Sequence, residues 1–290
     1  MHNHCGKVLK KKIAEKRALL VPGTPNALGA RIIADLGFEA LYLTGAGVTN
    51  MFLGVPDLGF IGLSELAQHA SAIRDITELP MIVDGETGFG NALNTRHAVR
   101  VLERAGANAI QIEDQIMPKR CGHFSGKEIV PVAEMISKIK SAVDSRSDEN
   151  FLVIARTDSL AVDGFEAAIE RAAQFIDAGA DMTFVEAPKS IDEVRRIPSA
   201  LSVPQVINLV IGGATPIIGA EDLKAMGFGL VLYANVALQG AIVGMQTALR
   251  ELKSHGRIDE RSAAVASFGE RQRLVQKSLY ENLERKYAHA

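Results

Sequence analysis

The sequence predicts an α/β protein folded as one (β/α)8 barrel of the TIM type. Eight short apolar runs rich in strand-forming residues recur along the chain, amphipathic helical segments separate most of them, and no linker divides the 290 residues. Runs that are apolar at nearly every position are typical of strands buried on both faces, as in parallel sheets. A doubly wound open sheet is the alternative, but no Gly-x-Gly-x-x-Gly motif follows the first run.

The strands are expected where these runs lie. In chain order they are Ala18–Val21, Ala40–Thr44, Met81–Asp84, Ala109–Ile112, Phe151–Ala155, Met182–Val185, Gln205–Asn208 and Leu230–Tyr233. Between them, Asn26–Leu36, Asn91–Ala105 and Phe165–Ala178 carry apolar residues at helical spacing. A glycine follows each of these segments, and glycine suits the left-handed position after a helix.

The C-terminal part of the chain is expected to be helical from Val236 onward. We predict a single domain over residues 1–290, with the barrel at about 18–253 and C-terminal helices over 254–290. Ser267–Tyr287 is expected as an extra helix beyond the barrel. It either packs on the barrel exterior or contacts a partner in an oligomer, and the residues alone do not favour one over the other.

Composition excludes several classes of function. With 32 basic and 34 acidic residues the net charge is −2, so no strong basic field is available for nucleic acid or an anionic membrane. No window approaches the ~18 apolar residues of a membrane span, and Met1–Arg17 lacks an apolar signal core. Two cysteines, Cys5 and Cys121, are too few for a disulfide scaffold. We therefore expect a cytoplasmic enzyme that acts on a small molecule.

Polar residues gather at the ends of the expected strands. They are Thr44 to Gly47, Asp84 to Gly88, Glu113 and Asp114, Arg156 to Asp158, Glu186, and Asn208. In a (β/α)8 barrel the chemistry lies at the C-terminal ends of the strands, so these side chains are expected around one rim. A single carboxylate among them could be structural, but their convergence favours an active site.

Three of these residues, Asp84, Glu86 and Glu113, are oxygen donors. Clustered carboxylates repel one another unless a cation neutralises them. Because no HExxH motif or Cys/His cluster is present, zinc is not expected, whereas oxygen ligands suit Mg²⁺, or Mn²⁺ in its place. Such an ion can chelate a 2-oxo or 2-hydroxy acid, and Arg156 could hold a substrate carboxylate bidentately.

A cysteine lies within a strongly basic segment. Lys119 and Arg120 precede Cys121, and His123 follows it, in a long stretch from Gln115 to Pro131. Positive neighbours favour the reactive thiolate, and a loop after the fourth strand would lie above the barrel mouth, where it could close over the site. The alternative is a basic surface loop with an incidental cysteine.

Five motifs together resemble the isocitrate lyase/phosphoenolpyruvate mutase superfamily. They are Gly54–Gly59, Asp84–Gly90, Ile112–Gln115, Lys119–His123 and Ala155–Asp158. The resemblance covers residues 18 to 253, and the Lys-Arg-Cys-Gly-His motif marks the carbon–carbon lyase branch, because the phosphonate mutases lack the cysteine. Within that branch the chain is similar to 2-methylisocitrate lyases and to the group of 2,3-dimethylmalate lyases, petal-death proteins and oxaloacetate hydrolases.

The resemblance implies a Mg²⁺ site. Asp84 would bind the ion directly, Glu86 and Glu113 would hold it through water, and Asp57 would lie near the metal shell. Arg156 would contact the substrate oxygens.

The resemblance also implies substrate-binding residues. Thr44, Gly45 and Ala46 would bind the carboxylate of the keto-acid half, while Glu186 and Asn208 would line the pocket.

In the cysteine motif, Cys121 would be the general acid, on a gating loop oriented by Lys119, Arg120 and His123, with Gly122 beside the substrate. The superfamily's barrels swap their C-terminal helix between partners and form tetramers, which implies a helix-swapped homotetramer here.

The chain departs from the superfamily pattern in two places and differs from 2-methylisocitrate lyases in a third. The usual Asp-Ala-Asp metal motif is Asp84-Gly85-Glu86, so one carboxylate is a methylene longer. Ile211 replaces a glutamate that many relatives carry after the seventh strand, and Gln111, counted here as substrate-binding, stands where 2-methylisocitrate lyases often have histidine. These changes affect the metal geometry and the substrate.

The main hypothesis is a Mg²⁺-dependent lyase that cleaves the C2–C3 bond of a 2-hydroxy di- or tricarboxylate to pyruvate or glyoxylate plus a carboxylate. Hydrolysis or decarboxylation of oxaloacetate on the same site is one alternative. Carboxyvinyl-carboxyphosphonate phosphorylmutase-like chemistry is another, in which Cys121 has no role. A non-catalytic dicarboxylate-binding protein is a third, supported only by Glu86 and Ile211.

Overall fold

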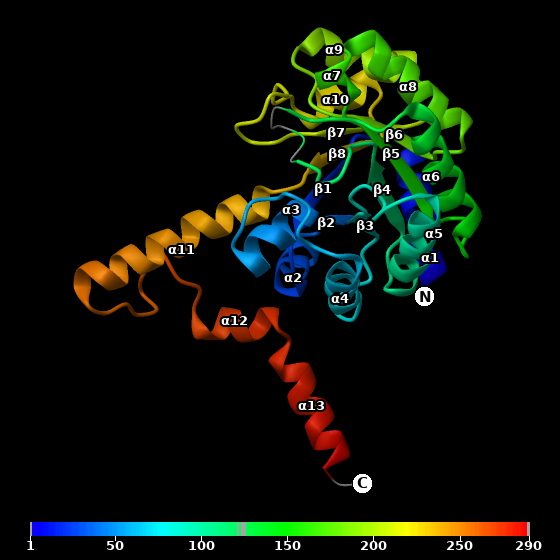
Figure 1. Cartoon of the computed structure of the whole chain (residues 1–290). Helices are drawn as coiled ribbons and strands as arrows, with labels where there is room; N and C mark the ends of the chain where they lie inside the picture. The colour runs from blue at the N-terminus through cyan, green and yellow to red at the C-terminus, as the bar shows by residue number, and fades with distance from the viewer. Residues whose placement is uncertain (1, 121, 123–125, 289–290) are drawn as a thin grey trace.

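The structure is a computed structural model that describes residues 2–120, 122 and 126–288, with the side chains of residues 2 and 3 left out. Its strands form one closed barrel (Figure 1). They are β1 (Leu19–Thr24), β2 (Leu41–Leu43), β3 (Met81–Asp84), β4 (Ala109–Glu113), β5 (Leu152–Thr157), β6 (Met182–Val185), β7 (Gln205–Asn208) and β8 (Leu230–Tyr233). Every pairing is parallel, and β8 pairs with β1 to close the ring. The predicted (β/α)8 barrel is confirmed, and each strand overlaps the run from which it was expected.

Helices surround this barrel. They are α1 (His2–Ala14), α2 (Ala27–Asp35), α3 (Gly45–Val48), the π-helix η1 (Thr49–Leu53), α4 (Leu63–Arg74), α5 (Ala92–Arg104), α6 (Val132–Ser145), α7 (Ser159–Val162), α8 (Phe165–Asp177), α9 (Ile191–Ala200), α10 (Ala220–Met226), α11 (Val236–His255), α12 (Phe268–Leu274) and α13 (Lys277–Tyr287). The three helices expected from periodicity correspond to α2, α5 and α8. Asn26 and Asn91 cap α2 and α5 by accepting hydrogen bonds from the first turn.

The strands are buried on both faces, as their composition predicts. Alternate side chains such as Tyr42, Ile82 and Leu232 point into the barrel and form one apolar cluster. Their neighbours, such as Leu43 and Val83, pack outward against the helices in a second cluster. The barrel is therefore a filled core that leaves room for chemistry only at its ends.

No helix or strand was assigned to the N-terminal segment from its sequence. Its lysine-rich sequence gives no strong strand or helix signal, yet residues 2–14 form α1. Leu9 and Ile13 of α1 are buried within the same cluster as the inward-facing strand residues. Ile13 also lies against Gly229, directly before β8. Helix α1 therefore covers the end of the barrel at which the strands begin.

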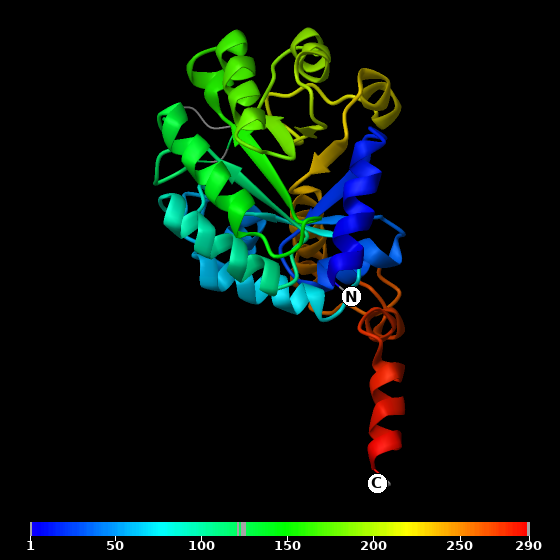
Figure 2. The same ribbon diagram turned by 90° about the vertical axis from the view of Figure 1, so that its right-hand side faces the viewer.

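The C-terminal helices leave the barrel. Helix α11 follows β8 and projects outward, and in both views α13 extends away from the body of the molecule (Figures 1 and 2). The single helix expected over 267–287 is wrong in detail, because Gln276 adopts a left-handed conformation with φ 56° and separates α12 from α13. Arg273 of α12 forms an ion pair with Asp35 of α2 at 2.7 Å. Across the described ranges, no helix combines the length and apolar character needed to cross a membrane.

Candidate active site

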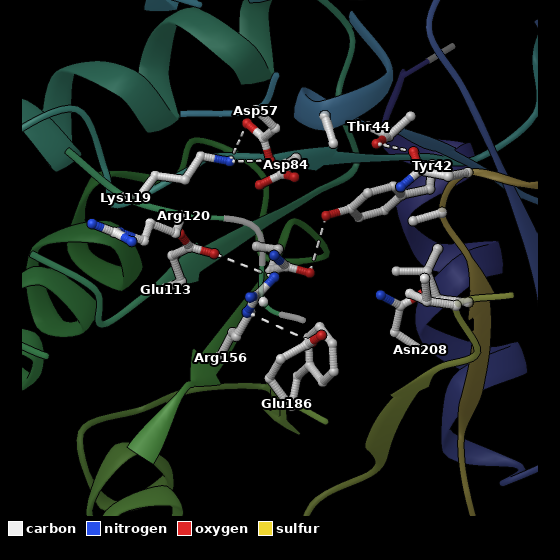
Figure 3. A pocket seen from close by; sticks show the side chains of 18 residues that line it. Tyr42, Thr44, Asp57, Asp84, Glu113, Lys119, Arg120, Arg156, Glu186 and Asn208 are labelled. Atoms are coloured by element: carbon white, nitrogen blue, oxygen red, sulfur yellow. Dashed lines mark hydrogen bonds and ion pairs between the residues drawn. The ribbon is translucent and has the colours of Figure 1, made fainter. Parts of the chain in front are cut away.

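A polar cavity lies at the C-terminal ends of the strands (Figure 3). Twelve of the residues singled out in the sequence line it: Thr44, Ala46, Asp57, Asp84, Gln111, Glu113, Lys119, Arg120, Gly122, Arg156, Glu186 and Asn208. Gly45 and Glu86 lie directly behind this lining and contact Asp84. Cys121 and His123 lie outside the described residues. One rim of the barrel therefore gathers these residues, contributed by six strands, β2 to β7, and their loops.

A buried lysine lies among the carboxylates. The Nζ atom of Lys119 is 2.7 Å from Asp57 Oδ1 and 2.7 Å from Glu86 Oε2. Burial lowers the pKa of Lys119, but the surrounding carboxylates, Glu86 foremost, outweigh it and raise that pKa well above its usual value. Figure 3 shows the lysine reaching toward Asp57 from the side of the cavity. Lys119 is therefore a fixed positive charge in an otherwise acidic corner.

Asp84 ends β3 and is oriented by backbone amides. Its Oδ2 accepts a hydrogen bond from the Gly45 N–H at 3.3 Å, and its Oδ1 accepts one from the Glu86 N–H at 3.1 Å. A Cβ atom on Gly45 would lie 2.1 Å from Glu86 Oε1. A glycine at this position therefore allows both carboxylates to approach the start of α3.

The close packing of the loop after β3 against β4 explains why position 85 is a glycine. The Gly85 N–H donates to the Gln111 carbonyl at 2.7 Å, and a Cβ there would lie 2.7 Å from that oxygen. Glu86 then takes a left-handed conformation with φ 52°. The loop thus runs closer to β4 than an alanine at position 85 would allow. From this left-handed backbone position, the Glu86 side chain reaches Lys119.

Arg156 lies across the cavity from Asp84 and is held by three acids. Its Nε and Nη2 donate to Asp158 at 2.9 and 3.1 Å, and its Nη1 is 3.3 Å from Glu113 Oε2. Glu186 Oε2 is 3.7 Å from Nε. Burial lowers the pKa of Arg156, but Asp158, Glu113 and Glu186 outweigh it and raise that pKa well above its usual value. The guanidinium is a permanent cation facing the cavity.

Several buried polar atoms at this cavity have no hydrogen-bond partner within the described part of the chain. They are Glu113 Oε1, Gln111 Nε2 and Asn208 Oδ1. Gln111 is oriented by Tyr42, whose hydroxyl donates to Oε1 at 3.0 Å and so leaves the amide nitrogen available. Burial raises the pKa of Glu113 to about 8, against the opposing effect of Arg156 and Lys119. Because buried polar groups are nearly always satisfied, these atoms indicate a polar ligand or water.

Arg120 differs from the other basic residues. Its side chain is exposed and, in Figure 3, extends away from the centre of the cavity. Gln115 holds its backbone, donating to the Arg120 carbonyl at 2.8 Å and accepting from the Arg120 N–H at 3.0 Å. The structure thus brings Lys119 into the acidic corner and leaves the Arg120 guanidinium at the rim.

The donor set fits a magnesium ion. In residues 2–120, 122 and 126–288 no three acidic, histidine or cysteine side chains are close enough to form a metal site by themselves. A bound ion would therefore need water or substrate oxygens among its ligands. Mg²⁺ is commonly held by one or two carboxylates and several waters. Asp84 would be the direct ligand, with Glu86 and Glu113 acting through water, and the unpartnered Glu113 Oε1 is available for such a contact.

Three residues that contribute to the site were not identified from the sequence. Tyr42 lies two residues before Thr44 on the same face of β2, so strand periodicity could have identified it. Asn235 follows β8 and accepts a hydrogen bond from the Thr44 hydroxyl at 3.2 Å, so the rule applied to the other strand ends would have found it. Lys127 lies outside any regular element, and no pattern in the sequence marks it.

Barrels of this kind hold their reactive groups at this end of the strands, so the fold and cavity together define a (β/α)8-barrel enzyme with a polar site at that end. The chain belongs to the phosphoenolpyruvate mutase/isocitrate lyase superfamily, since the family model described as phosphoenolpyruvate phosphomutase matches residues 9–253. The resemblance noted in the motifs is confirmed.

Several curated relatives are named lyases. The chain is 43% identical over 251 residues to a 2-methylisocitrate lyase of Aeropyrum pernix, an alignment that covers 87% of this chain and 80% of the relative. It is 39% identical to a 2,3-dimethylmalate lyase of Eubacterium barkeri, covering 83% and 85% of the two chains. The chain is accordingly an enzyme of the carbon–carbon lyase type.

Solved structures agree over the whole barrel. A crystal structure of 2,3-dimethylmalate lyase superposes with a TM-score of 0.91 at 32% identity, covering 97% of this chain and 95% of that one. A phosphonopyruvate hydrolase in complex with oxalate and Mg²⁺ superposes with a TM-score of 0.88 at 29% identity, covering 98% and 99%.

Proposed function

We propose that this chain is a Mg²⁺-dependent lyase that cleaves the C2–C3 bond of a 2-hydroxy di- or tricarboxylate, of the 2-methylisocitrate or substituted-malate type. The products would be pyruvate or glyoxylate and a second carboxylate. One observation carries the proposal: oxygen donors suited to Mg²⁺ around Asp84 face a permanent cation, Arg156, across a buried cavity. The names of the relatives support the same reaction class, and the Mg²⁺ complex of a structural neighbour supports the metal.

In this reaction a base removes the C2 hydroxyl proton, the C2–C3 bond breaks, and the electron pair left on C3 is protonated. Bound Mg²⁺, or Mn²⁺ in its place, would supply positive charge for the oxyanion beside the carboxylate. Arg156 would bind substrate oxygens, and Gln111 Nε2 would donate to a further oxygen, since Tyr42 directs it into the cavity. Thr44, Gly45 and Ala46 would hold the keto-acid carboxylate at the start of α3.

Cys121 would protonate the departing fragment, with Lys119, Arg120 and His123 orienting its loop. Replacing it (Cys121→Ser) is expected to lower turnover by about 10²–10⁴-fold, the usual contribution of a general acid. The fold and Mg²⁺ affinity should be retained, as circular dichroism and metal titration would report. Near-normal turnover in this variant would exclude the acid role.

The test of the function is a substrate panel with and without chelator. We expect Mg²⁺-dependent release of pyruvate or glyoxylate from 2-methylisocitrate, 2,3-dimethylmalate or a related 2-hydroxy diacid. Turnover of oxaloacetate alone would establish the hydrolase or decarboxylase alternative. Binding of these acids without turnover would establish a dicarboxylate-binding protein.

The proposal includes a cytoplasmic homotetramer with exchanged C-terminal helices. An apolar cavity between α2 and α11 supports it, because residues such as Leu28, Ile32 and Leu238 line a hollow of a kind that a helix of a second copy could fill. Helix α11 also exposes Val243 and Leu249. Exposed apolar residues that form one contiguous patch are typical of a protein interface.

A further inference from the structure

Lys127 is a buried lysine that the reaction outlined above does not use. Its side chain is only 2% exposed, and its Nζ lies 2.6 Å from Asp158 Oδ1. The same ammonium donates a hydrogen bond to the carbonyl oxygen of Gly122. A buried ammonium is tolerated only when it is paired and hydrogen-bonded, so these two contacts fix where the lysine lies.

The first contact joins Lys127 to the carboxylate that holds Arg156. Asp158 Oδ1 is shared by Lys127 at 2.6 Å and Arg156 Nη2 at 3.1 Å, while Asp158 Oδ2 accepts from Arg156 Nε at 2.9 Å. The Asp158 N–H in turn donates to Asp114 Oδ1 at 2.9 Å, and Arg171 holds Asp114 at 2.6 Å. Lys127 is therefore anchored on a rigid group at the end of β5.

The second contact lies at the cavity wall. A Cβ atom on Gly122 would lie 2.3 Å from Arg156 Nη2 and 2.6 Å from Glu186 Oε1, so the main chain of Gly122 rests directly on these two side chains. Lys127 holds the carbonyl of the same residue. The Gly122 peptide is thus held between Lys127 and the cavity-facing pair of Arg156 and Glu186.

We propose that Lys127 is a positioning residue, which fixes the Gly122 peptide against Arg156 and Glu186. Cys121, which precedes Gly122 in the chain, lies outside the described residues, and its link to Lys127 is its covalent bond to Gly122. The inference rests on the proposed function, in which that cysteine is the general acid. Asp158 still holds Arg156 when Lys127 is absent, because two other hydrogen bonds join them. Loss of Lys127 is therefore expected to impair the proton-transfer step and to spare substrate binding.

The test replaces Lys127 with methionine, which keeps the length of the side chain and removes the ammonium. We expect kcat to fall by about 100-fold, as for a catalytic group displaced by about 1 Å. KM and the affinity for oxalate with Mg²⁺ should stay within about threefold of the parent, since they depend on Arg156 and the metal. Should the variant not fold, Lys127→Arg would replace it, because arginine keeps the charge that Asp158 requires and changes the donor geometry. The same measurements of kcat, KM and oxalate affinity would then be compared with those of the parent.

The matched control is Arg146→Met. Arg146 also joins a carboxylate, Asp181 at 2.8 Å, to a backbone carbonyl, that of Phe151 at 3.0 Å, but at the opposite end of the barrel. It is expected to lose thermal stability and to keep kcat. A Lys127→Met variant with kcat near that of the control, or with KM and kcat changed in equal proportion, would overturn the proposal.

A second measurement separates this inference from the proposed reaction. In a Cys5→Ser background Cys121 is the only thiol, since the chain has two cysteines. Lys127→Met is expected to change the rate of alkylation by iodoacetamide at least fivefold, while the oxalate concentration that gives half-maximal protection in Mg²⁺ stays within about threefold of the parent. An unchanged alkylation rate would refute the positioning role even if no substrate is turned over by the parent enzyme.

Discussion

At the residue scale, Gly122 is a position at which the main chain lies directly against the cationic group of the cavity. Any side chain there would meet Arg156 Nη2 and Glu186 Oε1. Because both contacts are with functional ends of side chains, the cost of a larger residue should fall on activity more than on folding.

We therefore expect Gly122→Ala to lower kcat/KM by at least about tenfold, which corresponds to ~1.4 kcal/mol of transition-state stabilisation. Steady-state kinetics and thermal unfolding would be measured on the same samples. Gly219→Ala is the control, since a Cβ there meets only Asp222, at 3.7 Å. Equal activity in the two variants would contradict the tight contact at Gly122.

Asp158 carries the negative charge that pairs with two buried cations of the site, Arg156 and Lys127. Burial raises its pKa, but Arg156 and Lys127 outweigh burial and lower the pKa below 3.8. A carboxyl whose folded-state pKa is lowered stabilises the fold above its unfolded pKa and loses that contribution as the pH falls through the folded value.

Replacing Asp158 with asparagine leaves two buried cations with a neutral partner, and we expect unfolding free energy to fall by about 3–5 kcal/mol at pH 7. Urea unfolding at pH 7 and at values below 3.8 would measure this. The difference between parent and variant should shrink in the acidic range, as Asp158 becomes protonated. A constant difference across pH would mean that charge pairing is not the cause.

At the scale of elements, the strands were predictable and two helical regions were not. Strands such as Met81–Asp84 are apolar at nearly every position because both of their faces are buried, and this leaves a strong signal. Helix α1 was missed because Leu9 and Ile13 are its only buried hydrophobic residues among those described and four of its thirteen residues are lysines. The break between α12 and α13 depends on the left-handed backbone of Gln276, and no glycine at this position indicates it in the sequence.

The burial of Leu9 makes α1 a stabilising element. We expect Leu9→Ala to cost about 2–5 kcal/mol, the usual range for a buried leucine, because the side chain is fully buried at the barrel end. Lys11→Ala, on the exposed face of the same helix, should change stability by less than about 0.5 kcal/mol. Denaturant unfolding of the two variants would decide, and similar values for both would mean that α1 does not close the barrel.

At the scale of the whole molecule, the rule that strand ends carry the chemistry located most of the site. It brought Asp84, Glu113 and Arg156 to one rim from sequence alone. Contacts between distant loops could not be found in this way: the bridge from Lys119 to Asp57 joins residues 62 apart, and that from Lys127 to Asp158 joins residues 31 apart. Such pairings depend on distances that only the folded chain defines.

The last prediction concerns assembly. Helix α11 projects from the barrel with Val243 and Leu249 each 63% exposed, beside the apolar hollow between α2 and α11. If further copies cover this surface in a tetramer, light scattering should give about four times the chain mass of 31.1 kDa. The double variant Val243→Glu, Leu249→Glu should give smaller species, because charges are costly to bury in an interface. Ile191→Glu, an exposed apolar position on α9, should leave the mass unchanged. A monomeric parent protein would reject the tetramer, and an unchanged mass in the double variant would place the interface elsewhere.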